Sequence, residues 1–305
     1  MPQATFVGVG ELLWDLLPES KQLGGAPSNF AYISSLLGNR GIVVSRLGND
    51  ELGLTARDRC NDLDLDVSHL QFDPEHPTGT VNVKLEDGHP SFVINRDVAW
   101  DYLQWDAGLE HLAREADVVC FGSLAQRSET ARTTIQRFVR ATRESCLRIF
   151  DVNLRQSFYN GNILKTGFAL ATVTKLNNDE LPIVLRSVGL PSSDEPRADC
   201  RTLIEHFGLE LVCYTRGPHG SLLVSREHTA EHPGFRVTVA DTVGSGDAFT
   251  AAMAHQLRRG ASLDQVNEFA NRMGSWVASQ PGATPPSSEV FQGHLRDWTA
   301  SLASR

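Results

Sequence analysis

Short apolar runs rich in β-branched residues alternate along the chain with longer segments whose apolar residues recur every three to four positions. The first pattern predicts strands and the second amphipathic helices. We expect strands over Thr5–Val9, Ile42–Leu47, Asp117–Phe121, Leu147–Val152, Leu170–Lys175, Leu211–Thr215 and Ser221–Ser225. We expect helices over Ser28–Leu37, Ser128–Ser145, Glu180–Ser187, Asp199–Phe207, Ser245–Arg259, Leu263–Ser279 and Ser288–Leu302. Several strands are continuous apolar runs, which indicates a mainly parallel, doubly wound α/β sheet covered by helices on both faces. A chain of this length can form one large domain or two, and we expect one over residues 1–305.

One segment, Thr80–Ile94, departs from this alternation. Apolar and polar residues alternate in its first half, and an Asp87-Gly88 turn follows, which predicts a β-hairpin. The hairpin could be a small lid, with lid elements within residues 12–24 and 78–100, or an antiparallel edge of the main sheet. The pattern leaves both open.

Composition and charge argue against several classes of function. The formal net charge of −9 argues against broad binding of nucleic acid or anionic membranes, because both need a basic surface. The five cysteines are scattered without a C-x-x-C pair, so we expect no disulfide framework, and Cys120 and Cys213 lie in apolar runs that suit buried thiols. No H-E-x-x-H pair supports zinc catalysis, and no segment has the length and apolarity of a membrane span. We expect a cytoplasmic protein.

The segment with the strongest chemical signal is a strand–loop–helix unit that contains DTVGSGD (Asp241–Asp247). Alternating Phe235, Val237 and Val239 predict a strand before it. Small residues at Gly244-Ser245-Gly246 would begin a helix, where free N–H groups and the helix dipole favour a phosphoryl anion. Asp247, in the first helical turn, could cap the helix or accept a proton from an attacking hydroxyl. Within the motif DTVGSGD, between a predicted strand and a helix, we favour the role of Asp247 as the base.

A second segment, GGAPSNFAYISSLLG (Gly24–Gly38), predicts a flexible Gly24-Gly25 loop followed by a helix. Asn29 opens that helix. Its amide could cap the helix or hydrogen-bond to sugar hydroxyls, and the segment alone favours neither.

Together these two segments resemble, in order and separation, the two signature motifs of the PfkB/ribokinase family of carbohydrate kinases. Further similarities cover nearly the full chain: GELLWDLLP from Gly10, RLGNDELG from Arg46, KLNNDEL from Lys175 and TRGPHGS from Thr215. The resemblance implies a ribokinase-like fold with a small β lid. It also implies transfer of the ATP γ-phosphoryl group to a primary sugar hydroxyl. Rival nucleotide folds fit less well, because the chain has only G-x-G after its first strand and lacks the P-loop pattern.

The resemblance also implies a role for each matching residue. Asp247 would be the base, with Gly244, Ser245 and Gly246 as the anion hole. The sugar would contact Asp15, Gly24, Gly25, Asn29, Arg96 and Arg155, and Thr80 and Phe92 of the hairpin would reach it as well. The nucleotide site would contain Lys175, Asn177, Thr215, Gly217, Gly220, Asn271, Gly282 and Ala283. Asn177 and Glu180 would place Mg²⁺ through water, and Asp241 is the candidate ligand of a monovalent cation such as K⁺.

The subfamily is indicated by DVNLR (Asp151–Arg155), which resembles the D-P-N-L-R of fructokinase-like members with Val152 in place of proline. D-fructose is therefore the first substrate candidate, followed by 2-keto-3-deoxygluconate, ribose and nucleosides. A catalytically silent relative that binds sugar or nucleotide is the alternative from another class. Ser245 stands where the family usually has alanine, so it would crowd the anion hole or add a hydroxyl donor. Residues 95–101 match relatives loosely, and whether a homodimer forms through the lid stays open.

Overall fold

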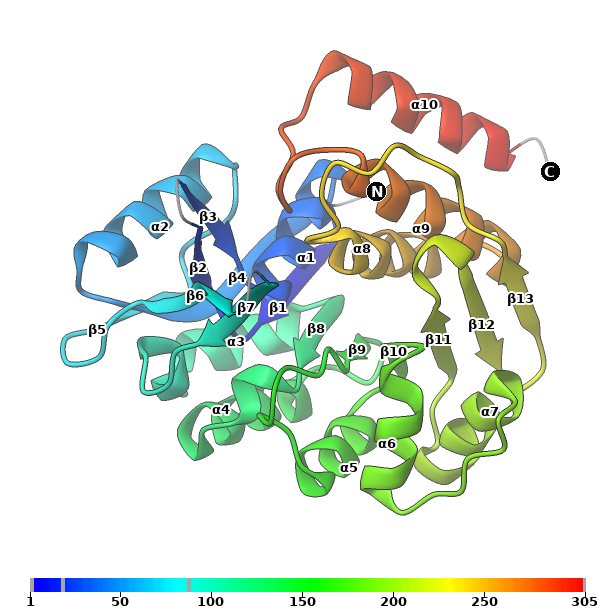
Figure 1. The fold of residues 1–305 in the computed structure, drawn as a ribbon, viewed down its shortest axis with the longest axis horizontal. Helices are drawn as coiled ribbons and strands as arrows, with labels where there is room; N and C mark the ends of the chain where they lie inside the picture. Colours follow the sequence, from blue (N-terminus) through cyan, green and yellow to red (C-terminus); the bar gives the residue numbers. More distant parts are fainter. Residues whose placement is uncertain (1–2, 18–19, 87–88, 304–305) are drawn as a thin grey trace.

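The computed structural model describes residues 3–17, 20–86 and 89–303. Its centre is a nine-stranded sheet in the order β13-β12-β11-β10-β9-β8-β1-β4-β5 (Figure 1). The strands are β1 (Thr5–Val9), β4 (Arg40–Gly48), β5 (Leu70–Asp73), β8 (Val118–Gly122), β9 (Leu147–Asp151), β10 (Val173–Asn177), β11 (Leu211–Thr215), β12 (Ser221–Ser225) and β13 (Thr229–His232). All neighbours pair in parallel except β12 and β13, which form an antiparallel edge.

Helices cover both faces of this sheet. One layer is formed by α1 (Ala26–Leu36), α2 (Glu51–Asp62), α8 (Ser245–Arg258), α9 (Leu263–Ala278) and α10 (Glu289–Ala303). The other is formed by α3 (Ala107–Glu115), α4 (Glu129–Ala141), α5 (Gly161–Leu170), α6 (Glu180–Val188) and α7 (Pro196–Phe207). Successive strand residues feed alternate cores: along β1, Phe6 packs into the first layer and Val7 and Val9 into the second. The predicted doubly wound, mainly parallel α/β sheet is confirmed.

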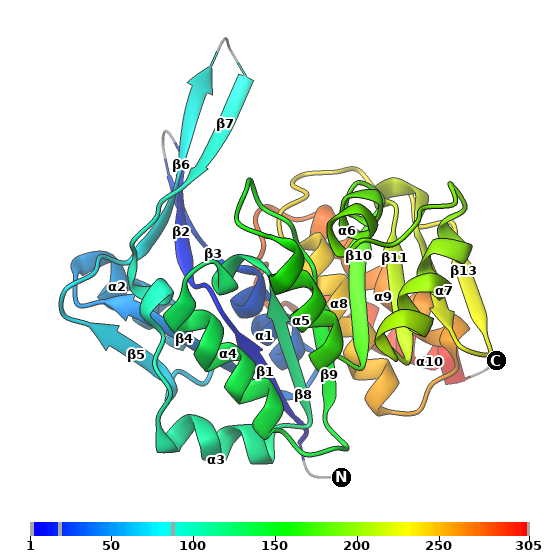
Figure 2. The ribbon, with the colours of Figure 1, turned by 90° about the horizontal axis from the view of Figure 1, so that it is seen from below.

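A second, four-stranded sheet stands apart from the first and projects from the body of the molecule (Figure 2). Its order is β3-β2-β6-β7, built from β2 (Leu13–Leu16), β3 (Lys21–Gly24), β6 (Gly79–Glu86) and β7 (His89–Ile94). We call it the lid sheet. The predicted hairpin is therefore the β6–β7 pair of this sheet and no edge of the main sheet. Its predicted turn at Asp87 and Gly88, and the side chain of Phe92, lie outside the described part of the chain.

The strand predicted at Phe235, Val237 and Val239 is wrong. Strand β13 ends at His232, and residues 233–240 have no regular structure, with Val237 41% and Val239 58% exposed. Pro233 has no N–H to offer a ladder, and Gly234 adopts a φ of +83° that turns the chain away from the sheet. The segment is anchored instead to the end of α9, where Ala240 N donates to Ala278 O at 2.9 Å.

The strand predicted over Leu170–Lys175 lies further along the chain, because α5 continues through Leu170 and β10 begins at Val173. The described residues also contain three short 3₁₀ helices: η1 (Ala99–Tyr102), η2 (Leu124–Gln126) and η3 (Gly217–His219). All five cysteines are buried and free. Among the described residues, no helix combines the length and apolarity needed to cross a membrane.

Candidate active site

The candidate site lies at one edge of the main sheet. Strands β1, β9, β10 and β11 run in the same direction, so their carboxyl ends lie side by side. Polar residues follow at those ends: Glu11 after β1, Asp151 on β9, Asn177 on β10 and Thr215 on β11. This edge is where ligands bind in open α/β sheets. The predicted residues Asn177 and Thr215 lie close together here because the fold aligns strands that are far apart in sequence.

The two predicted signature segments meet at this edge through a hydrogen bond. Nδ2 of Asn29, in the first turn of α1, donates to Oδ2 of Asp247, in the first turn of α8, at 2.8 Å. Asn29 does not cap its helix, since the N-cap is Gly25 and no side-chain cap bond is present. The Asn29 amide therefore donates to the Asp247 carboxylate, and this geometry excludes the alternative that Asn29 caps its helix.

The Asp247 carboxyl has the pKa of a group suited to proton transfer near neutral pH. Burial raises its pKa from 3.8 to about 6, and the charge of Asp151 adds to the rise. The hydrogen bond from Asn29 and the charges of Lys175 and Arg155 act in the opposite direction. A carboxylate with this pKa is ionised at pH 7 yet more basic than an exposed aspartate.

Beneath Asp247 lies a buried ion pair that the sequence did not reveal. Nζ of Lys175 on β10 is 3.1 Å from Oδ1 of Asp151 on β9, with side chains only 8% and 4% exposed. Thr250 Oγ1 donates to Oδ2 of the same aspartate at 2.9 Å. Burial disfavours the charged form of Lys175, but Asp151 and two further carboxylates raise its pKa above the usual range. Lys175 therefore keeps its charge, next to Gly246, where a Cβ would lie 3.1 Å from Nζ.

The glycine loop at the start of α8 packs against the loop that follows α9. Gly244 is the N-cap, with a φ of +76°, and an added Cβ would lie 2.5 Å from Cβ of Ala283. Asp241 ties the two loops together by accepting from Val243 N at 3.0 Å and from Gly282 N at 3.3 Å. Four predicted residues, Asp241, Gly244, Gly282 and Ala283, are thus brought together. Ser245 Oγ donates to Thr242 O at 2.8 Å, so its proton is used within the loop.

The predicted sugar-binding residues on the lid side also gather here. Asp15 on β2 lies over Gly24, where an added Cβ would be 2.6 Å from its Oδ2. Burial raises the pKa of Asp15 to about 6, while Arg155 lowers it. Arg155 is exposed and also lowers the pKa of Asp247 and of Glu11. The Arg155 guanidinium therefore lowers the pKa of three acidic side chains, those of Asp15, Asp247 and Glu11.

Glu11 is a buried acid that interacts with Asp247 and Arg155 and was not among the predicted residues. It is only 3% exposed, and burial raises its pKa from 4.5 to about 7, with Asp247 adding to the rise and Arg155 opposing it. Its signal in the sequence was an acid inside the apolar run FVGVGELLW, a place where a charged residue is seldom buried without a reason.

Asn177 and Glu180, the predicted magnesium residues, interlock at the start of α6. Glu180 accepts from Leu154 N at 2.7 Å on Oε1 and from Asn177 N at 2.9 Å on Oε2. Asn177 Oδ1 in turn accepts from the amides of Asp179 and Glu180, each at 2.9 Å. Each Glu180 oxygen keeps a further lone pair, which fits binding to a metal-bound water better than direct coordination. Both lone pairs of Asn177 Oδ1 are taken by the two amides, so this oxygen serves to shape the turn. Within the described ranges, no group of three or more histidine, cysteine or acidic side chains could hold a metal ion directly.

The predicted nucleotide residues lie at the end of β11 and on α9. Thr215 ends the strand, and Gly217 and Gly220 flank the η3 turn, with Gly220 at a φ of +78°. Asn271 is 7% exposed, and its Nδ2 donates to Ser221 Oγ at 2.7 Å and to Asn267 O at 2.8 Å. The amide N–H groups of Asn271 are therefore used to join α9 to β12.

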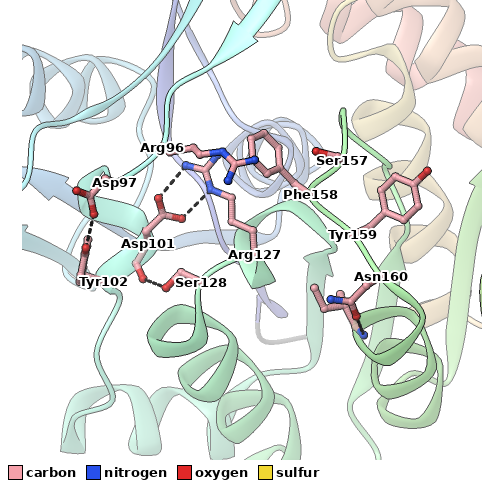
Figure 3. Close-up of a pocket in the computed structure, with 11 residues that line it drawn as sticks. Arg96, Asp97, Asp101, Tyr102, Arg127, Ser128, Ser157, Phe158, Tyr159 and Asn160 are labelled. Carbon is pink, nitrogen blue, oxygen red and sulfur yellow. Dashed lines mark hydrogen bonds and ion pairs between the residues drawn. The ribbon is translucent and has the colours of Figure 1, made fainter.

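Arg96 is placed at a separate cavity of about 400 Å³ (Figure 3). Its guanidinium stacks on Phe158 at 4.7 Å. Arg127 forms another wall; it bonds Asp101 through two nitrogens, each at 2.8 Å, and stacks on Trp100 at 3.9 Å. Thr80, also predicted to reach the sugar, accepts from Nδ2 of Asn95 at 2.6 Å. The structure gives no contact between either residue and Asp247.

Known proteins resemble this chain over nearly its whole length. Residues 19–290 match the pfkB family of carbohydrate kinases. A protein of Pyrococcus horikoshii described as an uncharacterised sugar kinase, PH1459, is 29% identical, with 93% of this chain and 94% of the relative covered. A fructokinase of Salmonella typhimurium is also 29% identical, over 82% of this chain and 83% of its own.

Solved structures give the same result. PH1459 in complex with ATP matches with a TM-score of 0.80 and 26% identity, covering 97% of this chain and 99% of that chain. Fructokinase from Vibrio cholerae with fructose, ADP and calcium matches with a TM-score of 0.77 and 26% identity, covering 97% and 98%. With the family match spanning most of the sequence and both signature segments joined at one site, this chain belongs to the pfkB family of carbohydrate kinases.

Proposed function

We propose that this sugar kinase transfers the γ-phosphoryl group of ATP to a primary hydroxyl of a ketohexose, with D-fructose as the first candidate. The observation that carries the proposal is the Asn29–Asp247 hydrogen bond, which fixes an acid of raised pKa at the N-terminus of α8. In this reaction the hydroxyl oxygen bonds to the γ-phosphorus, the bond between the γ-phosphorus and the β-phosphate oxygen breaks, ADP leaves, and Asp247 takes the hydroxyl proton.

The start of α8 supplies the electrostatic part of this reaction. The first-turn amides of a helix have no intrahelical acceptor and meet the positive end of its dipole. We place the transferring phosphoryl oxygens at residues 244–246, where glycines allow close approach. The charge of Lys175, held behind Gly246 by Asp151, adds to the positive field. Losing one such donor typically costs roughly 10²–10³ in rate.

Magnesium would accompany ATP and neutralise phosphate charge when it is bound. Glu180 would hold it through water, as the lone pair left on each of its oxygens allows. Asn177 would act with it by fixing the start of α6 through the amides of Asp179 and Glu180. Lys175, Thr215, Gly217, Gly220, Asn271, Gly282 and Ala283 remain our candidates for the nucleotide site. Asp241 remains the candidate for a monovalent cation.

The electrostatics of the sugar side favour a neutral substrate. Arg155 faces Asp15, Glu11 and Asp247 and lowers the pKa of each. The ionised carboxylates of Asp15 and Asp247 already balance its charge, so it would attract the carboxylate of 2-keto-3-deoxygluconate only weakly. Fructose, and after it ribose, fits this balance better than an acidic sugar.

The lid sheet would close over the sugar and exclude water that competes for the phosphoryl group. Gln22 of β3 already reaches the nucleotide side, where its Oε1 would lie 3.3 Å from a Cβ on Gly282. Saturating sugar should slow hydrogen exchange of the amides in 79–86 and 89–94. Equal exchange with and without sugar would rule out closure by this sheet.

The main test is ADP release from ATP and Mg²⁺ across fructose, tagatose, ribose, 2-keto-3-deoxygluconate and adenosine. We expect the highest kcat/KM with fructose, and we expect Asp247→Asn to lower kcat by roughly 10²–10⁴ while an ATP analogue still binds. Asp264→Asn is the matched control, because Asp264 is an exposed acid in the first turn of α9. Sugar binding by wild type without turnover on any substrate would favour a catalytically silent relative instead.

A further inference from the structure

Two buried polar atoms beside the base have no hydrogen-bond partner. They are Oε2 of Glu11 and Oδ1 of Asn29. Both side chains are only 3% exposed, and both atoms are closed off from solvent. Leaving a buried polar atom unpaired is costly, so each such atom needs an explanation.

The two residues belong to segments that are in contact. Glu11 directly follows β1, and its carbonyl oxygen would lie 2.4 Å from a Cβ on Gly25, the N-cap of α1. Asn29 is in the first turn of that helix, with its backbone N–H bonded to Gly25 O at 3.0 Å. The groups that act on the Glu11 carboxyl are its own backbone amide, the Ala26 amide of α1, the Asp247 carboxyl of α8, the Arg155 guanidinium from the loop after β9 and the Cys120 thiol of β8.

The chemistry of the two atoms makes them complementary in one protonation state. An amide oxygen can only accept a hydrogen bond, and a carboxylate oxygen can only accept, but a protonated carboxyl also donates. A proton on Oε2 would therefore supply the donor that Oδ1 of Asn29 lacks. Burial supports this state by raising the pKa of Glu11 to about 7.

We propose that Glu11 carries a proton in the working enzyme and donates it from Oε2 to Oδ1 of Asn29, which keeps Nδ2 of Asn29 directed at Asp247. Glu11 is then a positioning residue that acts on the base through the amide between them. The proposal rests on the proposed role of Asp247. If Glu11 lost its proton, the amide would no longer be held, and a second negative charge would face the base.

The test compares Glu11→Gln with Glu11→Met across the pH range, using kcat/KM for the sugar. Glutamine retains an N–H donor, whereas methionine has similar length and no donor. For wild type we expect activity to rise through the Asp247 ionisation at about 6 and to decline above the Glu11 ionisation at about 7. Glu11→Gln should keep the acid limb and lose the decline. Glu11→Met should move the acid limb up by about one pH unit, because Asp247 loses its held donor.

Two outcomes would overturn the proposal: an acid limb in Glu11→Met that coincides with wild type, or pH profiles of the two variants that are the same. A measurement without turnover separates this proposal from the kinase function. In protein labelled with ¹³C at glutamate carboxyls, the resonance that Glu11→Gln removes should titrate near 7. An ionised Glu11 at pH 6 refutes the proton placement, even if the protein is an active kinase. A titration near 7 in a protein without turnover supports the proton placement and refutes the kinase function alone.

Discussion

Replacing Asn29 with leucine should raise the pKa of Asp247, the proposed catalytic base. Leucine has a similar branched shape, so it excludes water as asparagine does, but it cannot donate to Asp247. The lost bond is 2.8 Å long and ends on a charged carboxylate. Such a bond is worth about 1.5–3 kcal/mol, and 1.36 kcal/mol corresponds to one pKa unit. The pKa of Asp247 should therefore move from about 6 to about 7–8.

The sign of the effect follows from which form the bond stabilises. Asn29 donates to the ionised carboxylate, so its removal favours the protonated form, which is inactive as a base. At pH 6.5 about three-quarters of the wild-type sites would be ionised, against about a quarter or fewer in the variant. We expect kcat/KM to fall by roughly 3- to 25-fold at that pH from this cause alone, and to recover this part by pH 9.

The assay is kcat/KM for the sugar between pH 5 and pH 9, with ADP release as the readout. Asn39→Leu is the matched control, because Asn39 is also a buried asparagine beside α1, and its amide bonds Ser34 O and His255. The control should keep the wild-type acid limb. A lower kcat/KM in Asn29→Leu that is uniform across pH, with the acid limb still near 6, would refute the reasoning.

Three further predictions concern stability. Lys175→Met should lower the free energy of unfolding in urea by about 3–5 kcal/mol, because it leaves Asp151 buried without its cation. Adding Asp151→Asn should recover much of that loss, and a double variant no more stable than the single would contradict this account. Glu11→Gln should be more stable than wild type at pH 8 by a larger margin than at pH 4. The folded-state pKa of Glu11, about 7, exceeds the ordinary 4.5, so wild type loses about 3 kcal/mol as the pH rises from about 4.5 to about 7. Equal differences between the two proteins at both pH values would argue against a buried neutral Glu11. Tyr32→Phe should cost about 1–3 kcal/mol, because the Tyr32 hydroxyl donates to buried Pro285 O at 2.6 Å; unchanged urea unfolding would show that this bond contributes nothing.

Local pattern was sufficient where one segment carries its own signal. Continuous apolar runs predicted buried parallel strands, and the small residues of DTVGSGD predicted the start of α8. Local pattern failed where contacts with the rest of the fold determine the secondary structure. Helix α2 buries only Gly53, Ala56 and Cys60, so its apolar pattern is weak. The alternation at 235–239 did not become a strand, because Pro233 and Gly234 lead the chain away from the sheet edge.

The candidate site shows the same division. The sequence alone determined that Asp247 follows a glycine-rich helix start and that Asn29 follows a second glycine pair, since both are contiguous motifs. Only the tertiary structure decided that these residues are bonded to each other, that Lys175 forms a buried ion pair with Asp151, and that Glu11 is buried beside them. Those contacts join residues up to 218 positions apart, and burial and charge depend on neighbours in space, which the order of residues along the chain does not specify.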